Sequence, residues 1–195
     1  SGDQVAWTMA RGYEGAFGGK SIKRLDVWLV LCAVFLLGLV DWRRPLGLRT
    51  LDLAPHPEGG HYKRVYQSSK QVEVNGVLRP SLTSISFLLV AGEESRWHRV
   101  DASEVWDWQE GAPLELRMYD AQARSLSRTQ LDTSARGGQL VQVVPAGIWQ
   151  SARSHGDYTL ANCSVTPGFV WSGFEILDEG SDTARDLRAI GGLAA

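Results

Sequence analysis

The sequence predicts a mainly β domain, a barrel of short antiparallel strands, preceded by one apolar α-helix. Short segments with strand-like alternation are separated by turns that contain Gly, Pro, Asn or Asp, and this spacing is typical of sandwiches and barrels. Within residues 103–109, Glu104, Trp106 and Trp108 fall on one face of a predicted strand, which places polar groups on a face that strands normally bury. The helix is predicted by residues 27–40, a run of fourteen residues without a polar side chain.

Length and composition limit the classes of protein to consider. The chain has 195 residues, enough to bury one hydrophobic core. A formal net charge of −2 gives no electrostatic case for nucleic acid, so no nucleic-acid partner is expected. The two cysteines, Cys32 and Cys163, lie in very different segments, so a disulfide framework is not expected.

The apolar run favours a single-pass transmembrane helix over residues 25–42. As a helix these residues would be about 27 Å long, close to the roughly 30 Å of hydrocarbon in a bilayer. Basic residues border both ends of the run: Lys20, Lys23, Arg24, Arg43 and Arg44. Two other interpretations stay open, a buried helix and the apolar region of a signal peptide. Because the basic residues on the two sides nearly balance, the side of the membrane that carries the barrel is left undetermined.

The chain divides into five predicted segments. These are an N-terminal arm (1–24), the transmembrane helix (25–42), a connector (43–55), the barrel (56–178) and a loosely held C-terminal tail (179–195). Strands are predicted at 61–67, 84–90, 114–119, 139–144, 158–165 and 169–177. Asn75 and Gly76 predict a hairpin turn between the first two of these strands.

Five short motifs occur in order between residues 46 and 178. They are His56-Pro57-Glu58-Gly59-Gly60, Trp97-His98-Arg99-Val100, Glu104-Val105-Trp106, Val144-Pro145-Ala146-Gly147-Ile148-Trp149-Gln150 and Val165-Thr166-Pro167-Gly168-Phe169. The set resembles the DUF985, or cupin 5, family of the cupin superfamily. The resemblance implies a cupin-type double-stranded β-helix, a jelly-roll barrel, and makes the segment before it an addition to the domain. It implies no reaction, because this branch has no settled activity and cupins host isomerases, oxygenases, storage proteins and binders.

The resemblance also bears on a metal cofactor. In catalytic cupins two His and one Glu of the first motif and one His of the second motif hold the metal. Here His98 matches the first His and Glu104 matches the Glu, whereas Val100 and Gln150 stand where the other two His would be. One imidazole, one carboxylate and one uncharged amide are a poor set of ligands for Fe, Mn or Zn. We therefore predict no cofactor, with metal binding disfavoured rather than excluded.

Without a metal, His98 and Glu104 are the candidate catalytic residues. A turn predicted at 101–103 would let the two side chains converge, and the carboxylate would then fix the tautomer of the imidazole. This pair is similar to the machinery of cupin-like deoxysugar epimerases, which use a His base in a metal-free barrel. The alternative is that the two side chains only satisfy each other inside a polar barrel, as a structural pair.

Six residues are candidates for ligand contacts: His56, Glu58, Tyr62, Arg64, Trp149 and Gln150. Tyr62 and Arg64 share one face of a predicted strand, and an arginine that faces a pocket suits a carboxylate or a phosphate. His56 and Glu58 either line the mouth of the barrel or cap the turn before that strand.

Two functional hypotheses follow. The apolar run favours a membrane-anchored accessory subunit of a larger membrane protein complex, with the lipid bilayer and integral membrane proteins as partners and a residual small-molecule pocket. The polar residues inside the predicted barrel favour the alternative, a metal-independent protein that binds a sugar-like molecule or isomerises it with His98 and Glu104. Whether the chain is an enzyme stays open between them.

Overall fold

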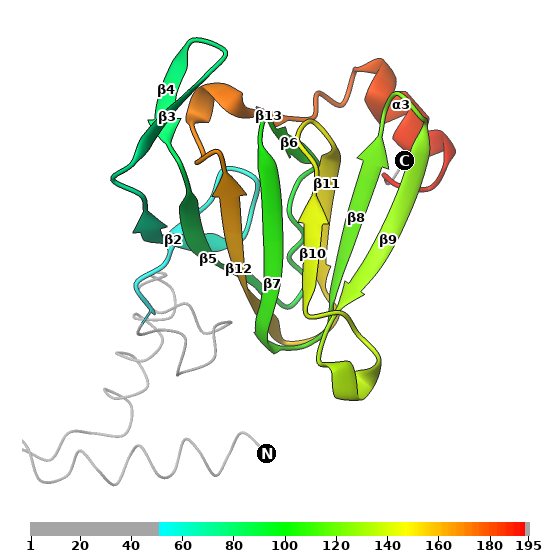
Figure 1. Cartoon of the computed structure of the whole chain (residues 1–195). Helices are drawn as coiled ribbons and strands as arrows, with labels where there is room; N and C mark the ends of the chain where they lie inside the picture. Colours follow the sequence, from blue (N-terminus) through cyan, green and yellow to red (C-terminus); the bar gives the residue numbers. More distant parts are fainter. Residues whose placement is uncertain (1–50, 194–195) are drawn as a thin grey trace, which may run out of the picture. The chain divides into compact units, whose positions relative to one another are not determined.

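The computed structural model describes residues 51–193, which form two antiparallel sheets and a separate hairpin (Figure 1). The six-stranded sheet has the order β1 (Ala54–Pro55), β2 (His61–Gln67), β5 (Thr83–Val90), β12 (Tyr158–Thr166), β7 (Ser103–Gly111) and β10 (Val141–Val144). The five-stranded sheet has the order β13 (Phe174–Ile176), β6 (His98–Val100), β11 (Trp149–Ser154), β8 (Leu114–Asp120) and β9 (Ser125–Leu131). The hairpin consists of β3 (Gln71–Val74) and β4 (Val77–Pro80). The 3₁₀-helices η2 (Ser134–Arg136) and η3 (Trp171–Gly173) and the α-helix α3 (Asp182–Ala189) also belong to the described part.

The main core lies between the two sheets. Phe87 from β5 and Trp106 from β7 belong to the six-stranded sheet, and they share one buried cluster with Leu116 from β8 and Ala152 from β11. Each of these side chains is exposed by 2% or less. Neighbours within a sheet, such as β5 and β12, are distant in sequence, and two facing sheets built in this way are typical of a jelly roll.

Most of the predicted strands are confirmed. The bounds of β2 are those predicted, and β5, β8 and β12 each extend one residue beyond the predicted range. Asn75 and Gly76 have φ angles of 51° and 78°, as the two-residue turn between β3 and β4 requires. The strands β9 and β11 were not predicted as separate elements.

The strand predicted over 169–177 is reduced to β13, which η3 precedes. The chain at Gly168 packs so closely against Pro80 that a Cβ atom there would lie 2.6 Å from the Pro80 carbonyl oxygen. The buried side chain of Arg79 also donates from Nε to the carbonyl oxygen of Gly168 at 2.6 Å. These contacts turn the chain out of the sheet after β12, so the residues that follow cannot continue as a strand.

The C-terminal segment is held by α3 instead of forming the loosely held tail that we predicted. The hydroxyl of Ser181 caps the helix by accepting a hydrogen bond from the backbone N–H of Ala184 at 3.2 Å. Ala184 and Leu187 lie on one face of α3 and are buried in a second cluster with Trp97 and Tyr119. Burial of this apolar face fixes the helix against the barrel, which strand periodicity could not indicate.

The predicted transmembrane helix, residues 25–42, and the predicted arm before it lie outside the described residues. Among residues 51–193, no helix has the length and apolar character needed to cross a membrane. The described residues therefore do not support the interpretation of the chain as a membrane-anchored accessory subunit, and we correct it: what the structure supports is the β domain and its interior.

Candidate functional site

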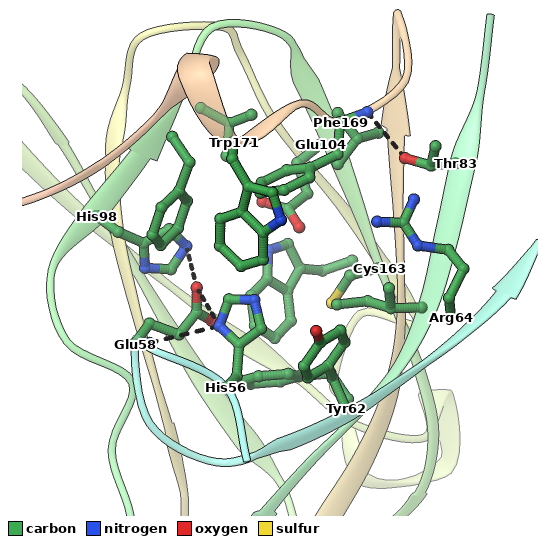
Figure 2. Close-up of a pocket in the computed structure, with 16 residues that line it drawn as sticks. His56, Glu58, Tyr62, Arg64, Thr83, His98, Glu104, Cys163, Phe169 and Trp171 are labelled. Carbon is green, nitrogen blue, oxygen red and sulfur yellow. Dashed lines mark hydrogen bonds and ion pairs between the residues drawn. The ribbon is translucent and has the colours of Figure 1, made fainter. Parts of the chain in front are cut away.

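A cavity opens inside the barrel, and Figure 2 shows the side chains that line it. Its polar lining comprises His56, Glu58, Tyr62, Arg64, Thr83, His98 and Glu104. Its remaining lining comprises Ile85, Phe87, Val100, Trp106, Cys163, Val165, Phe169, Trp171 and Phe174. Of the predicted site residues, all except Trp149 and Gln150 therefore line one cavity.

Strand alternation directs several of these side chains inward. On β2, Tyr62 and Arg64 are two residues apart and both line the cavity. On β7, Glu104 and Trp106 have the same spacing and both are buried. Because β2 and β7 belong to one sheet, these pairs lie along the same inner face.

A tight turn before β2 brings two further polar side chains to the cavity. Gly59 and Gly60 have φ angles of 104° and 67°, which glycine adopts far more readily than other residues. A Cβ atom at Gly60 would lie 2.8 Å from the carbonyl oxygen of Leu88, so only glycine lets the turn approach β5 this closely. The turn thereby holds His56 and Glu58 at the cavity wall.

The carboxyl group of Glu58 lies between two imidazoles, as Figure 2 shows. Its Oε2 is 3.3 Å from Nε2 of His98 and 3.3 Å from Nδ1 of His56. Nδ1 of His98 is 2.8 Å from the carbonyl oxygen of Arg96, and because a carbonyl only accepts, this nitrogen carries a proton. Nε2 lies at ion-pair distance from Oε2, so any proton on Nε2 would face the carboxyl group of Glu58.

The structure changes the predicted catalytic pair. His98 contacts Glu58, and within the described part of the chain no hydrogen bond or ion pair joins His98 to Glu104. The backbone N–H of Arg96 donates to the carbonyl oxygen of Glu58 at 2.6 Å, which ties the turn before β2 to the start of β6. This long-range contact, rather than the turn between β6 and β7, decides the partner of His98.

Glu104 is held by a separate chain of hydrogen bonds. Nε2 of Gln150 donates to Oε2 of Glu104 at 2.5 Å, and Oε1 of Gln150 accepts from Nε1 of Trp106 at 2.8 Å. An indole N–H only donates, so the amide oxygen of Gln150 must face Trp106 and its amide nitrogen must face Glu104. Gln150 therefore lies behind the cavity wall and orients the carboxyl group that lines it.

Burial raises the pKa of Glu104 from 4.5 to about 7. The neighbouring His98 lowers this pKa, the carboxyl group of Glu58 raises it, and the hydrogen bond from Gln150 lowers it by a smaller amount. A carboxyl group whose pKa lies near neutrality can both accept and release a proton, which is the property of a general acid or base.

The sequence of the whole β domain matches one known family. A sequence model described as "Cupin superfamily (DUF985)" matches residues 48–177. The chain belongs to this family. Two solved structures have a similar fold with a TM-score of 0.65 each: a hypothetical protein from Leishmania major at 29% identity and a protein of Shewanella oneidensis at 28% identity. The first match covers 74% of this chain and 92% of the other, and the second covers 76% and 95%. No protein with a curated description matches.

Trp149 is one predicted ligand contact that this DUF985 domain does not bring to the cavity. It is 4% exposed and packs with Trp97, Tyr119 and Leu177 on the side of the five-stranded sheet that α3 covers. Because successive side chains of a strand point to opposite faces, Trp149 points away from the cavity when Gln150 points toward it.

Aromatic residues after β12 line the mouth of the cupin cavity and were not predicted as site residues. Trp171 is 55% exposed and stacks on the ring of His56, with ring centroids 5.9 Å apart. Phe169 and Phe174 pack against Trp171 with centroid distances of 5.0 Å and 5.7 Å. The only sequence signal was the Pro167-Gly168-Phe169 motif, which marked the family without indicating that the chain leaves the sheet there.

Cys163 also lines the cavity but is not suited to act as a nucleophile. Its side chain is buried, and burial raises the pKa of the thiol well above its ordinary value, with Glu104 and Glu58 raising it further. The thiol therefore stays protonated at neutral pH, and the thiolate is the reactive form.

The donor set of this DUF985 domain does not fit the metal site of catalytic cupins. Nδ1 of His98 donates to a backbone carbonyl and Nε2 already contacts Glu58. The amide oxygen of Gln150 accepts from Trp106, so the group that faces Glu104 is an N–H donor, which cannot bind a metal. Among residues 51–193, no group of three His, Cys, Asp or Glu side chains is placed to hold a metal ion. The lack of a metal cofactor itself stays a prediction.

Proposed function

We propose that the cavity binds a small molecule and moves protons on it without a metal ion, as an isomerase or epimerase does. The observation that carries the proposal is Glu104, a buried carboxyl group in the cavity wall whose pKa is about 7. The hydrogen-bond partner of this carboxyl group is the uncharged amide of Gln150, and a buried group with a shifted pKa in a cavity is a candidate for function.

The second proton-handling group is His98 together with Glu58. Nε2 of His98 lies 3.3 Å from Oε2 of Glu58, so a proton on either atom is within reach of the other. His98 and Glu104 line the same cavity and have different hydrogen-bond partners, while the charge of His98 still lowers the pKa of Glu104.

In the proposed reaction, the carboxylate of Glu104 accepts a proton from a carbon atom next to a carbonyl group of the substrate. The electron pair of the broken C–H bond moves into the enolate, and the proton shared by His98 and Glu58 stabilises the enolate oxygen. Return of the proton to a different face or a different carbon gives the epimer or the isomer. The protons and electrons balance without an oxidant, a reductant or a cofactor.

A binding function without catalysis is the second candidate. It is favoured by one observation, namely that His98, Glu58 and Glu104 all have partners within the protein, which also describes a polar interior that is only structurally satisfied. The two candidates differ in whether bound molecules exchange carbon-bound hydrogen with solvent.

Exchange of carbon-bound hydrogen in D₂O tests the proposal. The protein would be incubated with aldoses, ketoses and sugar acids, and the loss of C–H signals would be followed by proton NMR. We expect exchange with at least one of them and a decrease of about 10²- to 10⁴-fold in Glu104→Gln. The matched control is Glu73→Gln, which makes the same chemical change on the exposed face of β3. Exchange that is equal in wild type and Glu104→Gln would show that Glu104 is not the acid or base.

A further inference from the structure

One charged side chain in the cavity takes no part in the proton-handling groups. Arg64 lies on β2, and Figure 2 shows it on the opposite side of the cavity from His98 and Glu58. Its guanidinium group lies over the ring of Phe169, with 5.9 Å between Cζ and the ring centroid. The side chain is exposed, so it lies where a ligand entering from solvent would meet it.

Arg64 differs from most arginines of this domain because it has no carboxylate partner. Seven other arginines each have a carboxylate oxygen within 4.0 Å: Arg79, Arg99, Arg117, Arg124, Arg136, Arg185 and Arg188. Within residues 51–193, no carboxylate lies at ion-pair distance from Arg64, and the two carboxyl groups of the cavity, Glu58 and Glu104, contact His98 and Gln150 instead. Within residues 51–193, the guanidinium group of Arg64 has one such electrostatic contact, the cation–π contact with the ring of Phe169.

The surroundings of Arg64 supply no negative charge, and they remove only part of its hydration because the side chain is exposed. Desolvation by burial lowers the pKa of Arg64, and the effect of Tyr62 in the opposite direction is smaller. A guanidinium group remains charged at neutral pH in any protein, so its partial loss of hydration is a cost that an anionic group could offset. Phe169 lies 5.9 Å from Cζ of the group, and within residues 51–193 no hydrogen bond or ion pair engages its N–H groups.

We propose that Arg64 binds the carboxylate of the ligand, so that the molecule that enters this cavity is a small organic acid. This inference names the ligand class for the proposed function, and it rests on that function only for the chemistry that follows binding. A carboxylate fits better than a phosphate because Arg64 is the only Arg or Lys among the cavity-lining residues, and one guanidinium matches one charge and two in-plane oxygens. An acid with a hydroxyl or carbonyl group beside its carboxylate would extend from Arg64 toward Glu104 and His98.

Isothermal titration calorimetry with D-glucuronate, D-glucose and inorganic phosphate tests the proposal. The first two probes share a ring and differ in the carboxylate, and phosphate supplies an anion without the ring. We expect saturable binding of D-glucuronate and at least about tenfold weaker binding of D-glucose, as a charge-assisted pair predicts. Equal affinity for the two sugars, tighter binding of phosphate, or no binding of D-glucuronate would overturn the proposal.

Three variants locate the effect. Arg64→Gln removes the charge and should weaken D-glucuronate binding by about 10- to 100-fold while leaving D-glucose unchanged. Arg64→Lys keeps the charge but loses the planar fork, so its affinity should lie between those of wild type and Arg64→Gln. Arg153→Gln removes one positive charge from the exposed surface of β11 and should have no effect. Unchanged binding in Arg64→Gln, or an equal loss in Arg153→Gln, would contradict the assignment.

The result can be separated from that of the exchange experiment. Binding of D-glucuronate that depends on Arg64, without any hydrogen exchange in wild type, would contradict proton transfer and leave the ligand class standing. Exchange of neutral sugars that depends on Glu104, without a preference for D-glucuronate, would contradict the ligand class and leave proton transfer standing.

Discussion

Nε2 of Gln150 lies 2.5 Å from Oε2 of Glu104, although 46 residues separate the two in sequence. The indole of Trp106 fixes the direction of the amide, because Oε1 of Gln150 accepts from its Nε1 at 2.8 Å. Gln150 therefore orients the carboxyl group of Glu104 from the position where catalytic cupins carry a histidine. It presents a hydrogen-bond donor to a buried carboxyl group and lowers a pKa that burial raises.

Gln150→Leu should raise the pKa of Glu104 above its value of about 7, because the variant removes a donor that favours the charged form. The variant should also lose about 1–3 kcal/mol of stability, since the buried N–H of Trp106 loses its acceptor. Carbon-detected NMR titration of the glutamate carboxyl groups measures the pKa, and Gln122→Leu on the exposed turn after β8 is the control. A pKa that stays the same or falls would show that Gln150 does not stabilise the carboxylate.

Glu104 should make the protein less stable as the pH rises toward neutrality. Its folded-state pKa of about 7 lies above the ordinary value of 4.5, so the folded state binds the proton more tightly than the unfolded state. The resulting stabilisation is complete below pH 4.5 and is lost as the pH rises through about 7. The loss should be on the order of 3 kcal/mol.

Urea unfolding of wild type and Glu104→Gln between pH 4 and about 8 measures this dependence. The amide cannot titrate, so the difference in unfolding free energy between the two proteins should change over this pH range and level off at both ends. Glu73→Gln should follow wild type throughout. Parallel curves for wild type and Glu104→Gln would mean that the carboxyl group titrates as it does in the unfolded chain.

His98 should carry its proton on Nδ1 in every state of the folded protein, because this nitrogen donates to the carbonyl oxygen of Arg96 at 2.8 Å. Nitrogen-15 NMR of the imidazole rings distinguishes the two tautomers. The Nδ1–H signal should persist in Glu58→Gln, since the acceptor is a backbone group that the substitution does not remove. Detection of a neutral His98 protonated only on Nε2 would contradict the proposed sharing of a proton with Glu58.

Leu187→Ala should destabilise the domain by about 2–5 kcal/mol, because the side chain is fully buried beneath α3. Ile190→Ala removes a side chain that is 44% exposed just after the same helix, and it should change stability by less than about 0.5 kcal/mol. Chemical denaturation of both variants gives the comparison. A similar small effect in the two would mean that the C-terminal segment is not part of the packed domain.

The purified protein should contain less than stoichiometric Mn, Fe, Ni and Zn, because Glu58 contacts His98 and the amide of Gln150 presents an N–H donor to Glu104. Its thermal unfolding should be unchanged by EDTA. Elemental analysis that finds one equivalent of any of these metals, lost together with stability on chelation, would reverse this expectation.

The sequence determined the β domain and most of its strands, because the signals for these are local. Alternation with a period of two residues predicts which side chains of a strand share a face, and it placed Tyr62 with Arg64 and Glu104 with Trp106 correctly. The turn at Asn75 and Gly76 was predictable for the same reason, since two neighbouring residues decide its backbone conformation. The family motifs then indicated the barrel.

Only the tertiary structure decided which side chains of the site contact one another. Glu58 rather than Glu104 is the partner of His98, because the turn at Gly59 and Gly60 brings Glu58 to the cavity wall. Gln150 donates to Glu104 because β11, in one sheet, faces β7 in the other. Arg64 was left without a carboxylate for the same kind of reason, since its neighbours in space come from other strands and loops. Local periodicity fixes the direction of a side chain, whereas its partners depend on register and loop packing between segments distant in sequence.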